Sequence, residues 1–136
     1  MNAIIVFIMT LGLTFATSAG QLYMPLDVEL LSINGEDTPS YLKQAPLNDG
    51  INLLKVRYIN YYTDDTNQHD DVAPTSDVYW LKFNTSSDIN LTVPKLYDLD
   101  EAKAFAHKPT FTLSNEDRQI HTDQLSNDAM IYKLLK

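Results

Sequence analysis

The densest set of side chains that could hold a metal ion or move a proton lies in one acidic stretch, residues 63–76. Its candidate ligands are Asp64, Asp65, His69, Asp70 and Asp71. Calcium sites of the EF-hand type need a central glycine and a terminal glutamate at fixed spacing, and this stretch has neither. We therefore interpret it as a solvated hairpin loop that binds no metal tightly.

The remaining histidines and carboxylates do not form a recognisable catalytic set. His107 and His121 lie far from the acidic stretch and belong to no zinc-binding pattern. The chain has no cysteine and no nucleophile elbow, so covalent catalysis lacks a nucleophile. Asp98 and Asp100 could act as acid and base, but capping of a helix explains them more simply. The sequence predicts a protein that is not an enzyme and needs no cofactor.

Aromatic residues gather around one long apolar stretch and the segment that follows it. They are Tyr58, Tyr61, Tyr62, Tyr79 and Trp80. Such a group could form a platform for a sugar or a peptide. Cross-strand packing within a sheet predicts the same residues, and we favour that interpretation.

The rest of the chain is expected to be organised around residues 51–62. This stretch contains no proline or glycine and alternates with a period of two, with Leu54, Val56 and Tyr58 on the more apolar face. The pattern predicts a long strand packed on one face. Because such a strand is not stable alone, the neighbouring segments must supply its partners.

The segments before this strand predict a bulged strand and a hairpin. Residues 26–30 alternate, but the apolar phase then shifts, which is typical of a β-bulge or of a strand that passes from one sheet to another. Asn34-Gly35 follows and is a strong hairpin signal. The returning arm, Glu36 to Ser40, is polar and contains Pro39, so it is expected to be short and irregular. Residues 41–45 fit either one helical turn or a short strand.

The second half predicts more strands and one helix. Residues 77–83 and 89–93 should follow the long strand as a three-stranded meander. Residues 98–108 have the caps and the apolar stripe of a helix, which Pro109 ends. Residues 110–114 and 118–122 fit strands, and the tail from Asp128 fits helix or strand equally. We predict a mostly-β, single-domain β-sandwich or partly open barrel over residues 20–136, with one packed α-helix.

The N-terminus has the pattern of an export signal. The apolar run Ala3 to Ala16 precedes Thr17-Ser18-Ala19, which predicts a signal peptide at residues 1–19 and cleavage before Gly20. A retained N-terminal anchor is the alternative. The absence of cysteine suits a bacterial periplasm or secretion better than a eukaryotic secretory route. The net charge of −8 disfavours nucleic acid and anionic membrane as partners.

The order and spacing of these elements are similar to those of a known bacterial family. The residues concerned are Leu26–Gly35, Leu47–Gly50 before Leu54–Tyr58, Ser76-Asp77 opening a strand that ends at Phe83, Val93-Pro94, Asp100–Phe105, and Pro109. This arrangement, over roughly Leu22 to Leu113, resembles a family of small exported proteins of Gammaproteobacteria that includes the curli synthesis inhibitor. The resemblance implies a protein without catalytic residues.

Two functions of different kinds follow from these observations. The first is a non-enzymatic periplasmic module that binds another exported protein through a sheet edge, with the arm Glu36 to Ser40 leaving that edge open. If the resemblance extends to the curli inhibitor, the partner is an amyloid-forming subunit whose assembly is modulated. The alternative is a domain that binds a carbohydrate or small ligand through the Tyr/Trp cluster.

Overall fold

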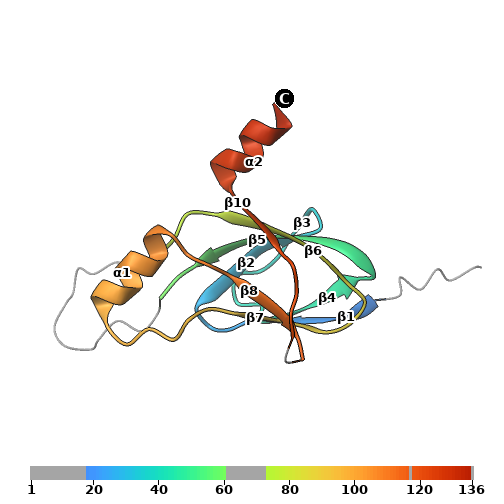
Figure 1. Ribbon diagram of the computed structural model, residues 1–136, viewed down its shortest axis with the longest axis horizontal. Helices are drawn as coiled ribbons and strands as arrows, with labels where there is room; N and C mark the ends of the chain where they lie inside the picture. Colours follow the sequence, from blue (N-terminus) through green and yellow to red (C-terminus); the bar gives the residue numbers. More distant parts are fainter. Residues whose placement is uncertain (1–17, 61–72, 117, 136) are drawn as a thin grey trace, which may run out of the picture.

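The computed structural model describes residues 18–60, 73–116 and 118–135. The predicted signal peptide up to residue 17 and the acidic stretch 61–72 lie outside the described residues. The described strands form two five-stranded sheets with one helix at the end of the sandwich and another projecting from it (Figure 1). The predicted mostly-β sandwich is confirmed, in preference to a partly open barrel.

Sheet I contains, in spatial order, β4 (Gln44–Asn48), β1 (Ser18–Tyr23), β7 (Ile89–Thr92), β8 (Thr112–Asn115) and β9 (Arg118–Gln119). Sheet II contains β10 (Asp123–Ser126), β6 (Tyr79–Thr85), β5 (Gly50–Tyr58), β2 (Val28–Ile33) and β3 (Glu36–Asp37). Neighbouring strands are antiparallel except β1 and β7, which run parallel.

Strand β5 is the centre of sheet II, as predicted. Its even-numbered residues from Asn52 to Tyr58 are buried, whereas the odd-numbered residues are exposed or half-buried. The buried face meets the inner face of sheet I in one hydrophobic core. The fully buried large side chains of that core include Leu22, Leu30, Leu47, Leu54, Val56, Tyr58, Leu81, Ile89 and Leu113.

The bulge and the hairpin before β5 are both confirmed. The register of the β2–β5 pair shifts between Leu30 and Ser32, which accounts for the change of apolar phase. Asn34 and Gly35 have φ angles of 50° and 85°, and positive φ at both positions is the mark of a type I′ hairpin turn. The returning strand β3 has only two residues.

The predicted three-stranded meander is wrong. Strand β7 lies in sheet I between β1 and β8, not beside β6. The turn before β7 carries the chain across the sandwich, and the Asp88 carboxylate accepts a hydrogen bond from the backbone N–H of Gln21 in β1 at 2.8 Å. Alternation reveals which face of a strand is buried but not which sheet it joins.

Helix α1 (Leu99–His107) is the predicted helix. The Asp98 side chain caps it by accepting a hydrogen bond from the N–H of Glu101 at 2.7 Å. Ala102 and Ala106 are buried, and the Phe105 and Tyr58 rings pack in a T-shaped arrangement with their centroids 4.7 Å apart. The helix therefore closes the end of the sandwich where β5 finishes.

Loss of this cap should destabilise the protein measurably. Asp98→Ala removes the acceptor for the Glu101 N–H, so the free energy of unfolding should fall by about 0.5–2 kcal/mol, the usual range for a helix cap. Asp100→Ala, in the first turn of the same helix, removes a charge but not the cap and serves as the control. Urea unfolding of both variants checks the prediction, and equal losses would contradict it.

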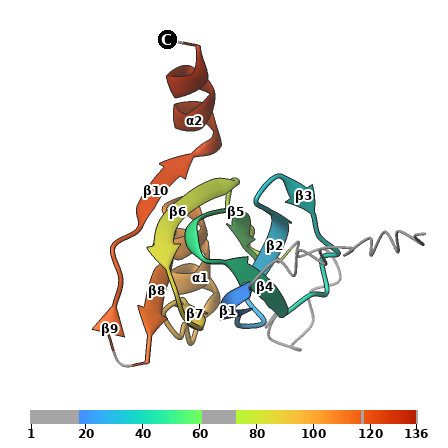
Figure 2. The ribbon, with the colours of Figure 1, turned by 90° about the vertical axis from the view of Figure 1, so that its right-hand side faces the viewer.

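The C-terminal segment differs most from expectation. The predicted strand at residues 118–122 is reduced to β9, and β10, which was not predicted, pairs with β6. The tail, whose sequence fits helix or strand equally, forms the helix α2 (Asn127–Leu134). This second helix buries no side chain and stands off the sandwich (Figures 1 and 2). Among the described residues, no helix is long and apolar enough to cross a membrane.

Candidate functional site

The two sheets present four edge strands, and they differ in their capacity to accept another strand. β3 and β9 have two residues each. β4 contains Pro46, whose missing N–H limits the ladder it can make. β10 has four residues, contains no proline and pairs with β6 on one side. In the described part of the chain, β10 is therefore the best candidate edge.

The arm Glu36 to Ser40, predicted to leave an open edge, is instead fastened to β2. The N–H of Thr38 donates to the Leu31 carbonyl at 3.1 Å, and its hydroxyl donates to the Leu30 carbonyl at 2.6 Å. Further along β2, the Lys43 ammonium donates to the Val28 carbonyl at 2.8 Å. These side chains occupy backbone acceptors that an added strand would need.

On β10, the direction of the backbone groups follows from its register with β6. Asp123 faces Lys82 and Leu125 faces Trp80, and the N–H of Asn127 donates to the Val78 carbonyl at 3.0 Å, which continues the ladder. Because bonded and non-bonded pairs alternate along an antiparallel ladder, the N–H and C=O of Gln124 point away from β6. Within the described residues, neither group is hydrogen-bonded to another backbone group outside the β10–β6 ladder.

The Gln124 side chain holds this edge in place. Its Oε1 accepts a hydrogen bond from the Phe111 N–H at 3.1 Å, and its Nε2 donates to the Pro109 carbonyl at 2.8 Å. The side chain thus bridges β10 to the chain that leads into sheet I. An edge strand anchored in this way keeps its backbone groups aligned for a partner.

One of the rows of side chains on the outer face of sheet II ends at Leu125 of this edge. Lys55, Trp80 and Leu125 lie side by side on β5, β6 and β10. The Lys55 ammonium is 5.4 Å from the centroid of the Trp80 ring, within cation–π distance. The indole N–H donates to Asn127 Oδ1 at 3.1 Å, which anchors the start of α2.

The aromatic cluster predicted from sequence does not form one platform. Tyr58 is fully buried in the core, and Tyr79 packs against Phe111 with the ring centroids 6.0 Å apart. Trp80 lies on the opposite, outer face. Tyr61 and Tyr62 lie outside the described residues. Packing across the sandwich therefore explains Tyr58 and Tyr79, and of the three cluster members that the structure describes only Trp80 lies on the outer face.

A group of charged residues surrounds the far side of β2. Arg57 Nε is 2.9 Å from Glu29 Oε2, and the Glu29 side chain is only 8% exposed. Burial raises the pKa of Asp27, and the nearby Lys43 opposes this shift. Burial likewise lowers the pKa of Lys43, against the attraction of Glu29 and Asp27. These paired charges fasten the segment around Lys43 to β2 and form no evident catalytic set.

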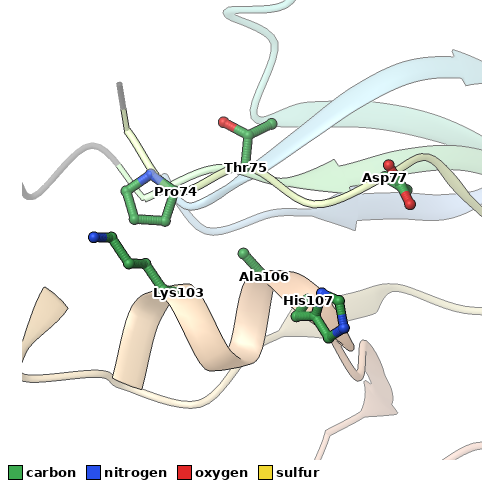
Figure 3. A pocket seen from close by; sticks show the side chains of 6 residues that line it. All are labelled: Pro74, Thr75, Asp77, Lys103, Ala106 and His107. Carbon is green, nitrogen blue, oxygen red and sulfur yellow. The ribbon is translucent and has the colours of Figure 1, made fainter. Parts of the chain in front are cut away.

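A pocket of about 240 Å³ lies between α1 and the segment that leads into β6 (Figure 3). Its lining residues are Pro74, Thr75, Asp77, Lys103, Ala106 and His107. The predicted position of His107 at the end of the helix is confirmed. No Phe, Tyr or Trp side chain lines this pocket, so it lacks the platform expected of a sugar site.

A second pocket, of about 260 Å³, lies where β10 meets α2. It is lined by Asp77, Val78, Ser126, Asn127 and Asp128. Its two carboxylates lie at the end of the candidate edge and give that region a negative charge.

The other chemistry-bearing residues remain apart. His121 is exposed, and its Nε2 is 3.1 Å from Asp123 Oδ1. Asp98 is a helix cap. Among the described residues, no three side chains of the metal-binding types come together. The five candidate ligands between Asp64 and Asp71 lie outside the described residues, so the absence of a metal there stays a prediction.

Comparison with known proteins places the chain in a bacterial family. A family model described as "Uncharacterized protein conserved in bacteria (DUF2057)" matches residues 21–132. The chain belongs to this family. The match begins within β1 and ends within α2, and it includes the β10 edge. Neither the curated proteins nor the solved structures gave a match.

Proposed function

We propose that the chain is a non-enzymatic periplasmic module that binds an extended segment of another exported protein by strand addition to β10. The observation that carries this proposal is the outward direction of the Gln124 backbone N–H and C=O on an edge strand with no proline. Backbone hydrogen bonds supply affinity in this mode of binding, and the flanking side chains supply specificity.

The partner in this proposal is an amyloid-forming subunit of the curli type. The resemblance to the family of the curli synthesis inhibitor motivates that choice, and membership in a bacterial family agrees with it. When a strand of such a subunit pairs with β10, the backbone groups on one of its two edges are no longer free to pair with another subunit. Because fibre growth needs free strand edges, binding would delay assembly.

The alternative, a carbohydrate or small-ligand domain, has less support. Neither of the two pockets described above has a Phe, Tyr or Trp side chain in its lining, and two of the predicted aromatic residues, Tyr58 and Tyr79, pack inside the sandwich.

The proposed function predicts a change in fibre kinetics. The chain without residues 1–19, added at equimolar ratio or below, should lengthen the lag time of fibre formation by a purified curli-type subunit, followed by thioflavin fluorescence. Gln124→Pro removes the outward N–H and places a proline ring at the edge, so it should abolish the delay.

Gln124→Ala is the matched control for this variant. Both substitutions remove the side-chain bonds to Pro109 and Phe111, but alanine retains the outward N–H. The alanine variant should therefore delay fibre formation less than the parent chain, because it loses the anchor of the edge, but more than Gln124→Pro. Thermal unfolding of both variants must show that they are folded at the assay temperature. An unaltered lag time with the parent chain, or equal activity of the two variants, would refute binding at β10.

A further inference from the structure

We infer that the segment bound at β10 is cationic and amphipathic, with an apolar residue beside Leu125 and a lysine or arginine beside Asp123. This inference rests on the proposed function, because it describes the partner of the same edge. It names the two side-chain positions that would select one extended segment over another.

The first step concerns which side chains an added strand would meet. Asp123 and Leu125 are two residues apart and pair with Lys82 and Trp80, so both lie on the outer face of sheet II. The outward backbone groups belong to Gln124 between them. In an antiparallel addition, Gln124 would thus form a hydrogen-bonded pair, and Asp123 and Leu125 would form the closer, non-hydrogen-bonded pairs. Side-chain selection is strongest at those close pairs.

The second step concerns the rows of side chains that an added strand would extend. One row runs Lys55, Trp80, Leu125, and it ends in a half-buried apolar side chain. An apolar residue placed next in that row would cover Leu125 and lengthen the hydrophobic strip. The neighbouring row runs Leu53, Lys82, Asp123. A cation placed next in that row would continue the alternation of charge.

The third step concerns the charge around the edge. The Asp123 side chain is 60% exposed, and Asp77 and Asp128 line the pocket at the far end of β10. The whole chain has a net charge of −8. A basic segment is therefore attracted during approach and at its final position, whereas an acidic one is repelled.

The same charges disfavour a second copy of this chain as the occupant. Two copies joined through their β10 edges would bring two Asp123 side chains and two acidic pockets to one interface. Each copy would also carry its net charge of −8. Charged residues on an edge strand are a common means of preventing such self-association.

The inner face of the edge adds little selection. Gln124 points inward, where its amide is already bonded to Pro109 and Phe111. An inward residue of the added strand would thus meet an amide with its hydrogen bonds already made. The outer-face positions beside Asp123 and Leu125 are those at which partner sequence matters most.

Synthetic peptides can test this selection directly. Two blocked peptides of about ten residues would be enough for a strand and its flanks. Both have threonine at every second position. At the other positions, valine alternates with lysine in one peptide and with glutamate in the other. Binding would be followed through the fluorescence of Trp80, the only tryptophan, which lies opposite Leu125. We expect the lysine peptide to bind about threefold to tenfold more tightly, the effect of exchanging an attractive for a repulsive cross-strand pair.

Three variants locate the effect. Asp123→Lys should reverse the preference in favour of the glutamate peptide. Gln124→Pro should abolish the binding of both peptides, whereas Gln124→Ala, which loses the side-chain anchor but keeps the outward N–H, should weaken the binding of both without abolishing it. Equal affinities for the two peptides, with both lost in Gln124→Pro, would overturn the charge selection but leave strand addition standing. If Gln124→Pro still binds the peptides, strand addition to β10 is refuted. Dimerisation of the parent chain through β10 in sedimentation would overturn the inference in favour of a second copy.

Discussion

Replacement of Leu54 by alanine is expected to lower the free energy of unfolding by about 2–5 kcal/mol. Leu54 is fully buried at the centre of β5, the middle strand of sheet II. It pairs with Leu81 of β6 and with Ile33 of β2, so truncation leaves a cavity that the flanking strands can fill only by moving. Urea unfolding of the chain without residues 1–19 would measure the loss from the change in midpoint.

Ile51→Ala is the matched control in the same strand. The Ile51 side chain is 62% exposed on the outer face, so its loss should change stability by less than about 0.5 kcal/mol. The two substitutions remove aliphatic groups of the same size class. Similar effects at the two positions would show that the buried face of β5 is wrongly assigned.

The second large effect is expected at Asn52, a buried amide in the otherwise apolar face of β5. Its Oδ1 accepts hydrogen bonds from the Asn48 N–H and from Asn34 Nδ2, both at 2.9 Å, and its Nδ2 donates to the Asn48 carbonyl at 2.9 Å. Asn52 thus joins the turn at Asn34-Gly35 to the turn that starts β5. Asn52→Ala leaves these partners without their hydrogen bonds. Because buried polar groups without partners are costly, the free energy of unfolding should fall by about 2–4 kcal/mol.

Asn84→Ala, on the exposed face of β6, provides the comparison for Asn52→Ala. It removes the same amide from a side chain in contact with water, and the free energy of unfolding should barely change. Melting temperatures of the two variants, measured by circular dichroism, would separate the cases. A melting temperature of Asn52→Ala equal to that of the parent chain would mean that solvent replaces the lost hydrogen bonds.

Local sequence signals were sufficient for much of the fold. The alternation of Leu54, Val56 and Tyr58 predicted the buried face of β5 because sheet burial has a period of two. The bulge after Leu30, the turn at Asn34-Gly35 and the cap at Asp98 were predicted because each depends on a few neighbouring residues.

Features that depend on distant parts of the chain were not predictable in this way. The placement of β7 in sheet I depends on its pairing with β1, about which the alternation of residues 89–93 carries no information. Asn52 is buried because two separate turns bring partners to its amide. No pattern within β5 indicates this.

The candidate site itself escaped prediction for a related reason. The sequence of β10, Asp123 to Ser126, is polar and lacks β-branched residues, so propensity argues against a strand. Tertiary contacts overcome that preference, since the Gln124 amide bonds to Pro109 and Phe111. An edge strand held by such contacts is not apparent from the local sequence pattern. The arm Glu36 to Ser40 was the more visible candidate for an open edge, and the structure shows it bonded to β2.

The position of β1 has a consequence for the order of folding. β1 is the first strand of the described chain, but it lies inside sheet I between β4 and β7. Its parallel pairing joins Leu22 to Ile89, so a large loop must close before the strand has both neighbours. Sheet I therefore cannot form in step with synthesis from the N-terminus. Folding should be slow compared with that of a helical domain of equal length, because long-range strand pairing limits its rate.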